Sequence, residues 1–205
     1  MLEAYLFVDP LCNDCFKAEH VILKLADTLD KNFSFQFIPM LNMQIIRNRY
    51  LNCDKQTMNE NKSFKIDYNT VLDYKASLFQ GRKCGRKFLI GLQEELIHKK
   101  QTYSKAVAFK VAEKAGLDLE MFEEDRRSDL AISAFKADQK LANEMKITTP
   151  ASAVIFDCDS FDSGILMNKV TYNDLLDVCK NKGILDNDPI LIQKSGEKSP
   201  NLHII

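Results

Sequence analysis

The sequence predicts an α/β fold in which a block of helices interrupts one sheet domain. Three observations support this prediction. Residues 4–38 read as strand, helix and strand, residues 69–145 hold helical patterns and no proline, and residues 153–182 return to strands and a helix. Because two α/β parts flank the helical block, we expect them to combine into one sheet.

The N-terminal part is predicted to be a βαβ unit. Residues 4–8 are a short apolar run ended by Asp9-Pro10, which is typical of a buried strand. Apolar side chains recur at helical spacing through 13–29 and give the helix one apolar face. Phenylalanine alternates with polar residues over 33–38, which indicates a second strand. The chain therefore opens as strand, helix and strand.

The middle of the chain is predicted to be helical after a polar start. Residues 40–68 are rich in Asn, and we expect a loop with short helices there. Gly116 suits the position after a helix end, and Asp118 suits the cap of the next helix. The helices are predicted at 69–80, 82–98, 103–115, 118–126 and 128–145.

The C-terminal part is predicted to complete the sheet. Strands are expected at 153–156 and 164–167, joined by a turn at 157–163 that is rich in Asp and Ser. A helix follows from Thr171 to Lys182. The predicted organisation is therefore a sheet domain of 1–40 and 147–185, a helical insertion at 41–146, and a mostly disordered tail at 186–205.

Length and composition exclude several classes of protein. The 205 residues, 45% hydrophobic and 28% charged, fit a globular chain that needs no disulfide staples. The net charge of −1 gives no general attraction to nucleic acid or anionic membrane, so neither is an expected partner. No signal peptide and no apolar run of membrane length is found, so we expect a cytoplasmic protein. Phosphate-loop, serine-hydrolase and metalloprotease motifs are also missing from the sequence.

The six cysteines divide into one pair and four dispersed residues. In a reducing compartment the dispersed cysteines, at 53, 84, 158 and 179, are best interpreted as small core residues. Cys12 and Cys15 form a C-x-x-C pair where the first strand meets the first helix. A thiolate at a helix N-terminus is stabilised by the helix dipole, and a second cysteine one turn later can resolve a mixed disulfide. This pattern predicts a thioredoxin-like redox motif.

Thr149-Pro150 agrees with that interpretation. A thioredoxin-like fold has a cis-proline just before its third strand, facing the cysteines, and Pro150 stands directly before the predicted strand at 153–156. Two acidic neighbours argue against a strong oxidant. Asp9 and Asp14 are expected to raise the pKa of the thiols. Two interpretations of the motif therefore stay open: a redox-active pair, and a pair that is kept with the fold but has no catalytic activity.

Other candidate sites have weaker support. A structural zinc ion needs four ligands, and no second C-x-x-C or paired histidines accompany the first pair, so we expect no metal or cofactor. His98 is expected to be a solvated charge at a helix end. A basic stripe (Arg82, Lys83, Arg86 and Lys87) and an acidic one (Glu120, Glu123, Glu124 and Asp125) are interpreted as solvated helix faces.

Several stretches resemble the SpxH (YjbH) group within the DsbA-like branch of the thioredoxin superfamily. The opening Tyr5 to Cys12 with Cys15-Phe16 is similar to that group's F-x-D-P-x-x-x-x-C start. The segments that continue the resemblance are Asp73 to Ala76, Gln80 to Arg82, Phe88, Gln93 to Glu95, Ala115 to Phe122, and Ala142 to Ile147 with Pro150 to Ser152. Together they span about 5 to 156.

The resemblance implies a thioredoxin-like fold with an inserted all-helical domain, as in DsbA. It also implies a cytosolic adaptor that binds the redox-responsive regulator Spx and promotes its degradation by the ClpXP protease. The positions carried over are Cys12, Cys15 and Pro150, which would be the catalytic residues if the motif is active. The alternative is a thiol–disulfide oxidoreductase or isomerase that uses the two cysteines. The missing leader and the acidic dipeptide favour the adaptor.

Overall fold

The computed structural model describes residues 1–29, 33–51, 60–157, 160–181 and 202–204. The chain divides into two compact units. One unit, the sheet unit, comprises Met1–Val8, Lys17–Ile38 and Ala151–Ile205. The other, the helical unit, comprises Asp9–Phe16 and Pro39–Pro150. The short segment that carries both cysteines therefore groups with the helices.

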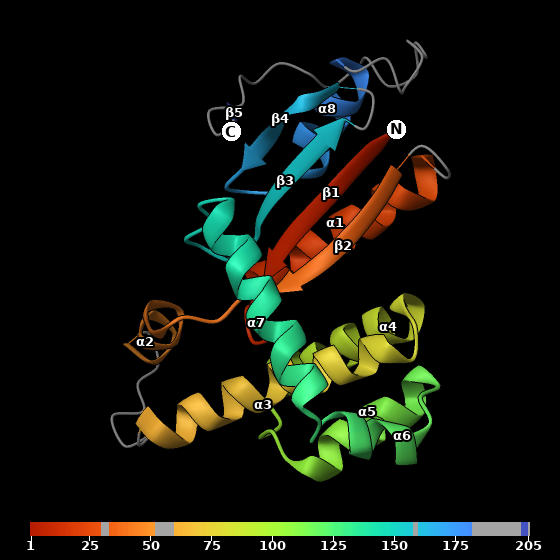
Figure 1. The fold of residues 1–205 in the computed structure, drawn as a ribbon, viewed down its shortest axis with the longest axis vertical. Helices are drawn as coiled ribbons and strands as arrows, with labels where there is room; N and C mark the ends of the chain where they lie inside the picture. The colour runs from red at the N-terminus through yellow and green to blue at the C-terminus, as the bar shows by residue number, and fades with distance from the viewer. Residues whose placement is uncertain (30–32, 52–59, 158–159, 182–201, 205) are drawn as a thin grey trace. The chain divides into compact units, whose positions relative to one another are not determined.

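The sheet unit is built on five strands in the order β2-β1-β3-β4-β5. Their bounds are β1 Leu2–Val8, β2 Phe33–Pro39, β3 Ser152–Asp157, β4 Ser160–Met167 and β5 Leu202–Ile204. β1 pairs antiparallel with β3, from Leu2 opposite Asp157 to Phe7 opposite Ser152. The arrows of β1 and β2 point the same way in Figure 1, as expected of a βαβ unit. The two α/β ends of the chain thus share one sheet, as predicted.

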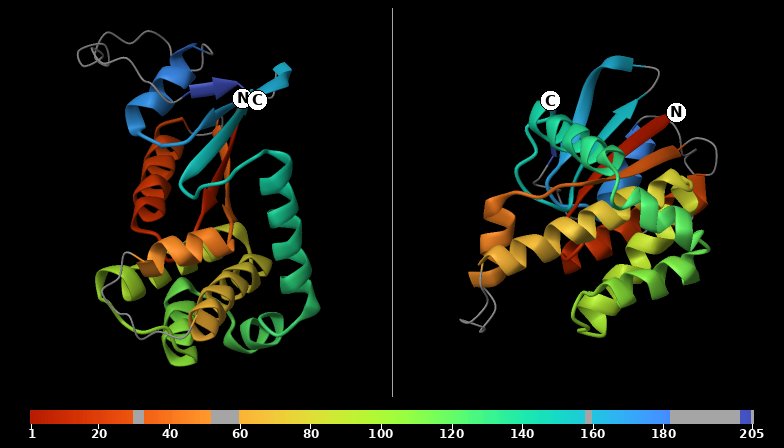
Figure 2. Two further views of the ribbon diagram at one scale, coloured as in Figure 1. Left: turned by 90° about the vertical axis from the view of Figure 1, so that its left-hand side faces the viewer. Right: turned by 60° about the horizontal axis from the view of Figure 1, so that its bottom comes forward.

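Helices α1 (Asn13–Leu29) and α8 (Tyr172–Asn181) lie on the same side of that sheet (Figure 2, left). The Lys24 ammonium stands 4.5 Å from the centre of the Tyr172 ring and joins the two helices. Fully buried apolar side chains come from both faces of β1 and β3 and from both helices. They include Leu6, Phe7, Ile22, Leu25, Val154 and Leu175.

The helical unit contains α2 (Met43–Leu51), α3 (Glu60–Phe79), α4 (Arg82–Gln93), the π-helical turn η2 (Glu94–His98), α5 (Lys105–Ala115), α6 (Leu119–Asp125) and α7 (Asp129–Glu144). Hydroxyl or carboxylate side chains cap three of these helices. Ser104, Asp118 and Ser128 each accept a hydrogen bond from a backbone N–H of the first turn. The predictions of an Asp118 cap and of Gly116 after the end of α5 are confirmed, and Gly116 is left-handed there, with a φ of 82°.

Three predicted elements differ from the structure. α3 begins at Glu60, nine residues before the predicted start, and the helix expected over 82–98 changes to a π-helical turn at Glu94. β4 begins at Ser160, so most of the predicted turn at 157–163 belongs to a strand. Within the predicted tail, β5 pairs with the open edge of β4 because that edge offers unpaired backbone groups. The rest of the tail lies outside the described residues.

Candidate functional site

Cys12 sits at the start of α1 because the preceding turn is held by Asp9. The Asp9 carboxylate accepts a hydrogen bond from the N–H of Leu11 at 2.9 Å. The Asp9 carbonyl accepts another from the N–H of Cys12 at 3.0 Å. The carbonyl of Cys12 then accepts the N–H of Phe16 and begins the helix. Asp9 therefore has a structural role in placing the first cysteine at the helix N-terminus.

The two cysteines differ in exposure. Cys12 is half-buried, whereas Cys15 is completely buried beneath the turn. The N–H of Asp9 donates to the Cys15 sulfur at 3.3 Å. Both cysteines are free thiols. The segment thus presents one sulfur toward solvent and keeps the other directly behind it.

The pKa of Cys12 is lowered from 9.0 to about 7. The largest cause is a hydrogen bond from the Cys15 thiol, which stabilises the Cys12 thiolate. Burial opposes this effect, while the backbone N–H groups of Cys15 and Asp14 support it. The negative charge of Asp9 raises the pKa, as the sequence indicates, but its effect is smaller. The expectation that acidic neighbours would leave Cys12 with a raised pKa is therefore wrong.

The pKa of Cys15 moves the other way and is raised well above 9.0. Burial is the main cause, followed by the hydrogen bond and the charge of Cys12. At neutral pH the outer sulfur is thus partly a thiolate, while the inner one stays a protonated thiol. This division suits attack by Cys12 on a disulfide and resolution by Cys15. The arrangement is chemically able to exchange disulfides.

An aromatic contact lies directly after the pair. The Phe16 ring meets the His98 ring edge-on, with centroids 4.6 Å apart. His98 closes the π-helical turn η2 and is exposed, as the sequence predicts. The ring contact is not evident from the sequence, because 82 positions separate the two residues. It ties the cysteine segment to the helices of its own unit.

The structure corrects one expectation about Pro150. No cis peptide bond occurs among the described residues, so the Thr149–Pro150 bond is trans. The chain turns instead at Ala151, whose φ of 63° is left-handed and whose N–H donates to the Phe7 carbonyl at 2.8 Å. β3 begins at the next residue. The catalytic role that the resemblance implies for Pro150 stays a prediction.

The remaining cysteines and acidic groups form no second reactive site in the described part of the chain. Cys179 is buried as predicted, Cys84 is half-buried, and Cys53 and Cys158 lie outside the described residues. Across the described ranges, no group of three or more His, Cys, Asp or Glu is placed to hold a metal ion. Within the same ranges, no helix is both long and apolar enough to cross a membrane.

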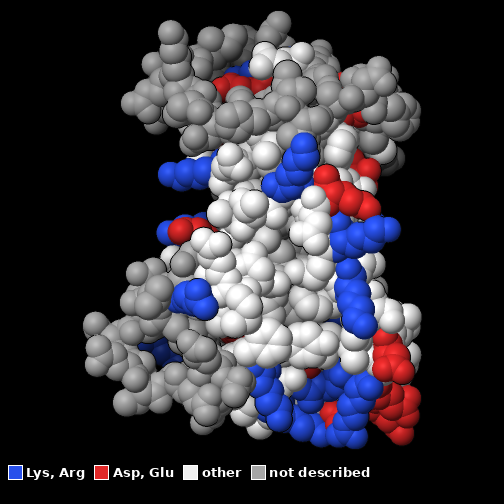
Figure 3. All heavy atoms as spheres, turned by 60° about the vertical axis from the view of Figure 1, so that its left-hand side comes forward, with Lys and Arg blue, Asp and Glu red and all other residues white. Residues whose placement is uncertain are grey.

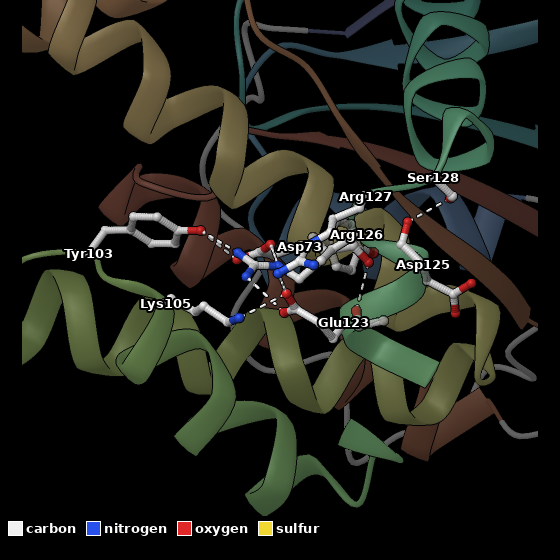
Figure 4. A network of polar contacts seen from close by, with 10 residues as sticks. Asp73, Tyr103, Lys105, Glu123, Asp125, Arg126, Arg127 and Ser128 are labelled. Atoms are coloured by element: carbon white, nitrogen blue, oxygen red, sulfur yellow. Dashed lines mark hydrogen bonds and ion pairs between the residues drawn. The ribbon is translucent and has the colours of Figure 1, made fainter. Parts of the chain in front are cut away.

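A buried polar network that the sequence patterns do not predict stabilises the helical unit (Figure 4). Asp73 is almost fully buried on α3. Its carboxylate accepts hydrogen bonds from the Tyr103 hydroxyl and from the Arg126 Nε, both at 2.6 Å. Burial nevertheless raises the pKa of Asp73, with Arg126 and Tyr103 opposing the rise. The network joins α3, the loop before α5 and the end of α6.

Two glutamates of the helical unit each contact three basic side chains. Glu123 binds Lys105 at 2.8 Å and also contacts Arg126 and Arg127. The buried Glu95 has three lysine ammonium groups within 4 Å. Hydrogen bonding by Lys99 is the main reason that the pKa of Glu95 is lowered. Figure 3 shows Lys and Arg gathered at the lower end of one face with carboxylates among them.

Comparison with known proteins supports both the predicted fold and the predicted resemblance. A family model described as thioredoxin matches residues 5–178. The ClpXP adapter protein SpxH of Bacillus subtilis (strain 168) is 31% identical over 183 residues, which cover 80% of this chain and 61% of the relative. The protein of the same name from Bacillus cereus (strain ATCC 14579) is 33% identical over 187 residues, with 80% and 62% coverage. The chain spans about six tenths of the length of these relatives.

Solved structures confirm the fold class. A putative protein disulfide isomerase from Nitrosomonas europaea has a TM-score of 0.65 at 13% identity, covering 88% of this chain and 98% of that one. The cytosolic disulfide reductase DsbM from Pseudomonas aeruginosa also has a TM-score of 0.65, at 11% identity and with 90% and 100% coverage. At such identities the likeness concerns the fold alone. The predicted thioredoxin-like fold with inserted helices is thus confirmed.

Proposed function

This chain belongs to the thioredoxin family, and from that premise we propose that it acts as an adaptor that binds the regulator Spx and promotes its degradation by ClpXP. The observation that carries the proposal is the 31–33% identity, over four fifths of the chain, to proteins named ClpXP adapter protein SpxH. The proposed place of action is the cytoplasm, where a regulator and its protease would meet.

The surface of the helical unit supports a binding role. Among the described residues, the exposed large hydrophobic side chains other than Met1 all belong to this unit. They are Met43, Phe64, Phe79, Met121 and Leu130. Exposed apolar side chains beside charged groups are typical of protein interaction surfaces. We therefore assign client binding to the helical unit.

The proposal is tested with purified Spx and ClpXP. Binding is measured by pull-down, and the half-life of Spx is measured with and without this chain. We expect direct binding and a shorter half-life when the chain is added. A Cys12→Ser/Cys15→Ser variant should act equally well if adaptor work needs no thiol chemistry. The adaptor proposal would be contradicted if Spx did not bind this chain and its half-life with ClpXP were unchanged when the chain is added.

A thiol–disulfide oxidoreductase is the second candidate, and the lowered pKa of Cys12 is the observation that favours it. In this reaction the Cys12 thiolate attacks one sulfur of a substrate disulfide and releases the other as a thiolate. Cys15 then loses its proton and attacks the Cys12 sulfur. The products are a Cys12–Cys15 disulfide and a reduced substrate.

The oxidoreductase is tested by insulin reduction with dithiothreitol as the final electron donor. Turnover that is lost in Cys12→Ser and that leaves a mixed disulfide in Cys15→Ser would support this candidate. Wild-type protein that reduces insulin no faster than dithiothreitol alone would eliminate it. The two candidates are independent, because the first is measured by Spx half-life and the second by thiol turnover.

A further inference from the structure

The first two turns of α4 carry four cations that we call the α4 basic face: Arg82, Lys83, Arg86 and Lys87. Arg82, Lys83 and Lys87 are exposed, and Arg86 is half-buried. In the part of the chain that the structure describes, no carboxylate pairs with Arg82, Lys83 or Lys87. The lysines and arginines around Glu95 and Glu123 differ in this respect, because each of those contacts a carboxylate.

The placement of these cations disfavours the helix that holds them. The N-terminus of a helix is the positive end of its dipole, and the first turn of α4 contains no acidic residue. Its cap residue, Gly81, provides no side-chain hydrogen bond, unlike the caps of α5, α6 and α7. The pairs 82/86 and 83/87 also bring like charges together at i and i+4. Residues that oppose local stability in this way are typical of functional surfaces.

Two exposed apolar side chains belong to segments connected to the start of α4, one through the chain itself and one through hydrogen bonds of Gln80. Phe79 ends α3, three residues before α4 begins at Arg82, and is 37% exposed. The side chain of Gln80 makes two hydrogen bonds with the backbone of Asp118 and so fixes the start of α6 at this corner. Met121, on the first turn of α6, is 54% exposed. A partner at this corner would meet both positive charge and apolar surface.

The helical unit as a whole is also positively charged. The helical unit holds 20 Lys and Arg against 17 Asp and Glu, whereas the sheet unit holds 8 against 12. The net charge of −1 therefore conceals a helical unit of +3 and a sheet unit of −4. An acidic partner is thus attracted to the helical unit and repelled by the rest of the chain.

We propose that the α4 basic face docks an acidic segment of a partner protein, with an apolar side chain of that segment against Phe79. A protein segment fits better than nucleic acid, because three exposed cations on two helical turns make only a short run of phosphate contacts. The inference goes beyond the proposed function, since it holds whether or not the partner is delivered to ClpXP.

The decisive variant is Arg82→Glu/Lys83→Glu, tested in the full chain. It reverses two charges of the face and turns both like-charge pairs into favourable Glu–Arg and Glu–Lys pairs at i and i+4. It also places carboxylates at the positive end of the helix dipole. We expect the melting temperature to rise by about 2 °C while binding is lost. A misfolded variant would instead lose binding together with a decrease in melting temperature.

The matched control is Lys65→Glu/Lys136→Glu, which changes the net charge equally at exposed lysines of α3 and α7. The probe is a short fluorescein-labelled peptide rich in Glu with one central Phe, and its affinity is measured by anisotropy at two salt concentrations. We expect about tenfold weaker binding to the Arg82→Glu/Lys83→Glu variant and less than a twofold change for the control. The neutral Arg82→Gln/Lys83→Gln variant should fall between wild type and the charge reversal.

Three results would overturn the proposal. Equal loss of peptide binding in both charge-reversal variants would mean that only net charge matters. Tighter binding of a thymidine oligonucleotide than of the peptide would identify a nucleic-acid surface. No binding of the peptide to wild type would remove the site altogether. Because Spx degradation is not measured here, none of these results bears on the adaptor proposal.

Discussion

The pKa of Cys12 gives the most quantitative prediction. Its value of about 7 depends chiefly on the hydrogen bond from the Cys15 thiol. Replacing Cys15 by Ala removes that donor, while burial and the charge of Asp9 still raise the pKa. We therefore expect the pKa of Cys12 to return to its ordinary value of 9.0 or above. A Cys15→Ser variant keeps a donor at the same place and should retain most of the lowering.

The size of the effect on reactivity follows from the thiolate fraction. At pH 7 about half of Cys12 is ionised in the wild type, and about 1% would be ionised at a pKa of 9. A thiolate of higher pKa is a better nucleophile, and a rise of two units in thiol pKa increases its intrinsic reactivity about six- to tenfold. The net loss of alkylation rate at pH 7 is therefore about five- to eightfold.

The assay is alkylation with iodoacetamide between pH 5 and 10, with each cysteine followed separately by mass spectrometry of its peptide. The buried Cys179, whose pKa burial raises to about 11, serves as the internal reference for an unreactive thiol. A wild-type Cys12 that titrates near 9 would refute the reasoning. An unchanged Cys12 midpoint in Cys15→Ala would do the same, because the hydrogen bond would then have no effect.

Three further predictions concern stability. Arg126→Met leaves the buried Asp73 carboxylate without its cation and should lower the free energy of unfolding, measured in urea, by about 3 kcal/mol. Adding Asp73→Asn to that variant should restore much of this loss. A double variant no more stable than the single one would contradict this account. Gly85→Ala should destabilise by about 1–3 kcal/mol, because a new Cβ would lie 2.5 Å from a methyl carbon of Leu78; a stabilised variant would show that helix propensity outweighs the clash. The pKa of Glu95 is lowered, so its carboxylate stabilises the fold above pH 4.5, and this contribution disappears as the pH falls through the folded pKa. Glu95→Gln should therefore melt at a lower temperature than wild type at pH 7 but lose less melting temperature between pH 5 and 3. Equal decreases in the two proteins would argue against a role for this carboxylate.

The order of elements could be predicted from the sequence because most helices and strands have regular apolar patterns. The start of α3 could not, because polar side chains occupy much of its buried side. Ser63, Asp67 and Thr70 are nearly inaccessible, whereas Phe64 is exposed. The Thr70 hydroxyl donates to the carbonyl of Asp67, which satisfies it within the helix. Such a helix has no apolar stripe, so residues 60–68 are indistinguishable from a polar loop.

The candidate site was predictable in position but not in its electrostatics. The C-x-x-C spacing identifies a helix N-terminus with two adjacent sulfurs, and the structure places Cys12 and Cys15 there. The acidic residues at 9 and 14 suggest a raised pKa, but their effect depends on atoms that a sequence does not display. The Asp14 backbone N–H stabilises the thiolate, and the Cys15 thiol outweighs the charge of Asp9. Hydrogen-bond geometry, which the sequence does not give, therefore sets the direction of the Cys12 pKa shift.

The pairing of β1 with β3 has a consequence for how the chain is made. The partners Leu2 and Asp157 are 155 positions apart in a chain of 205 residues. At roughly 5–20 residues per second, a ribosome needs about 8–30 s after β1 to produce β3. During that interval β1, which is largely apolar, has β2 on one edge and no partner strand on the other. Until β3 emerges, that edge of β1 is therefore open to pairing with other chains, which makes the unfinished polypeptide prone to aggregate.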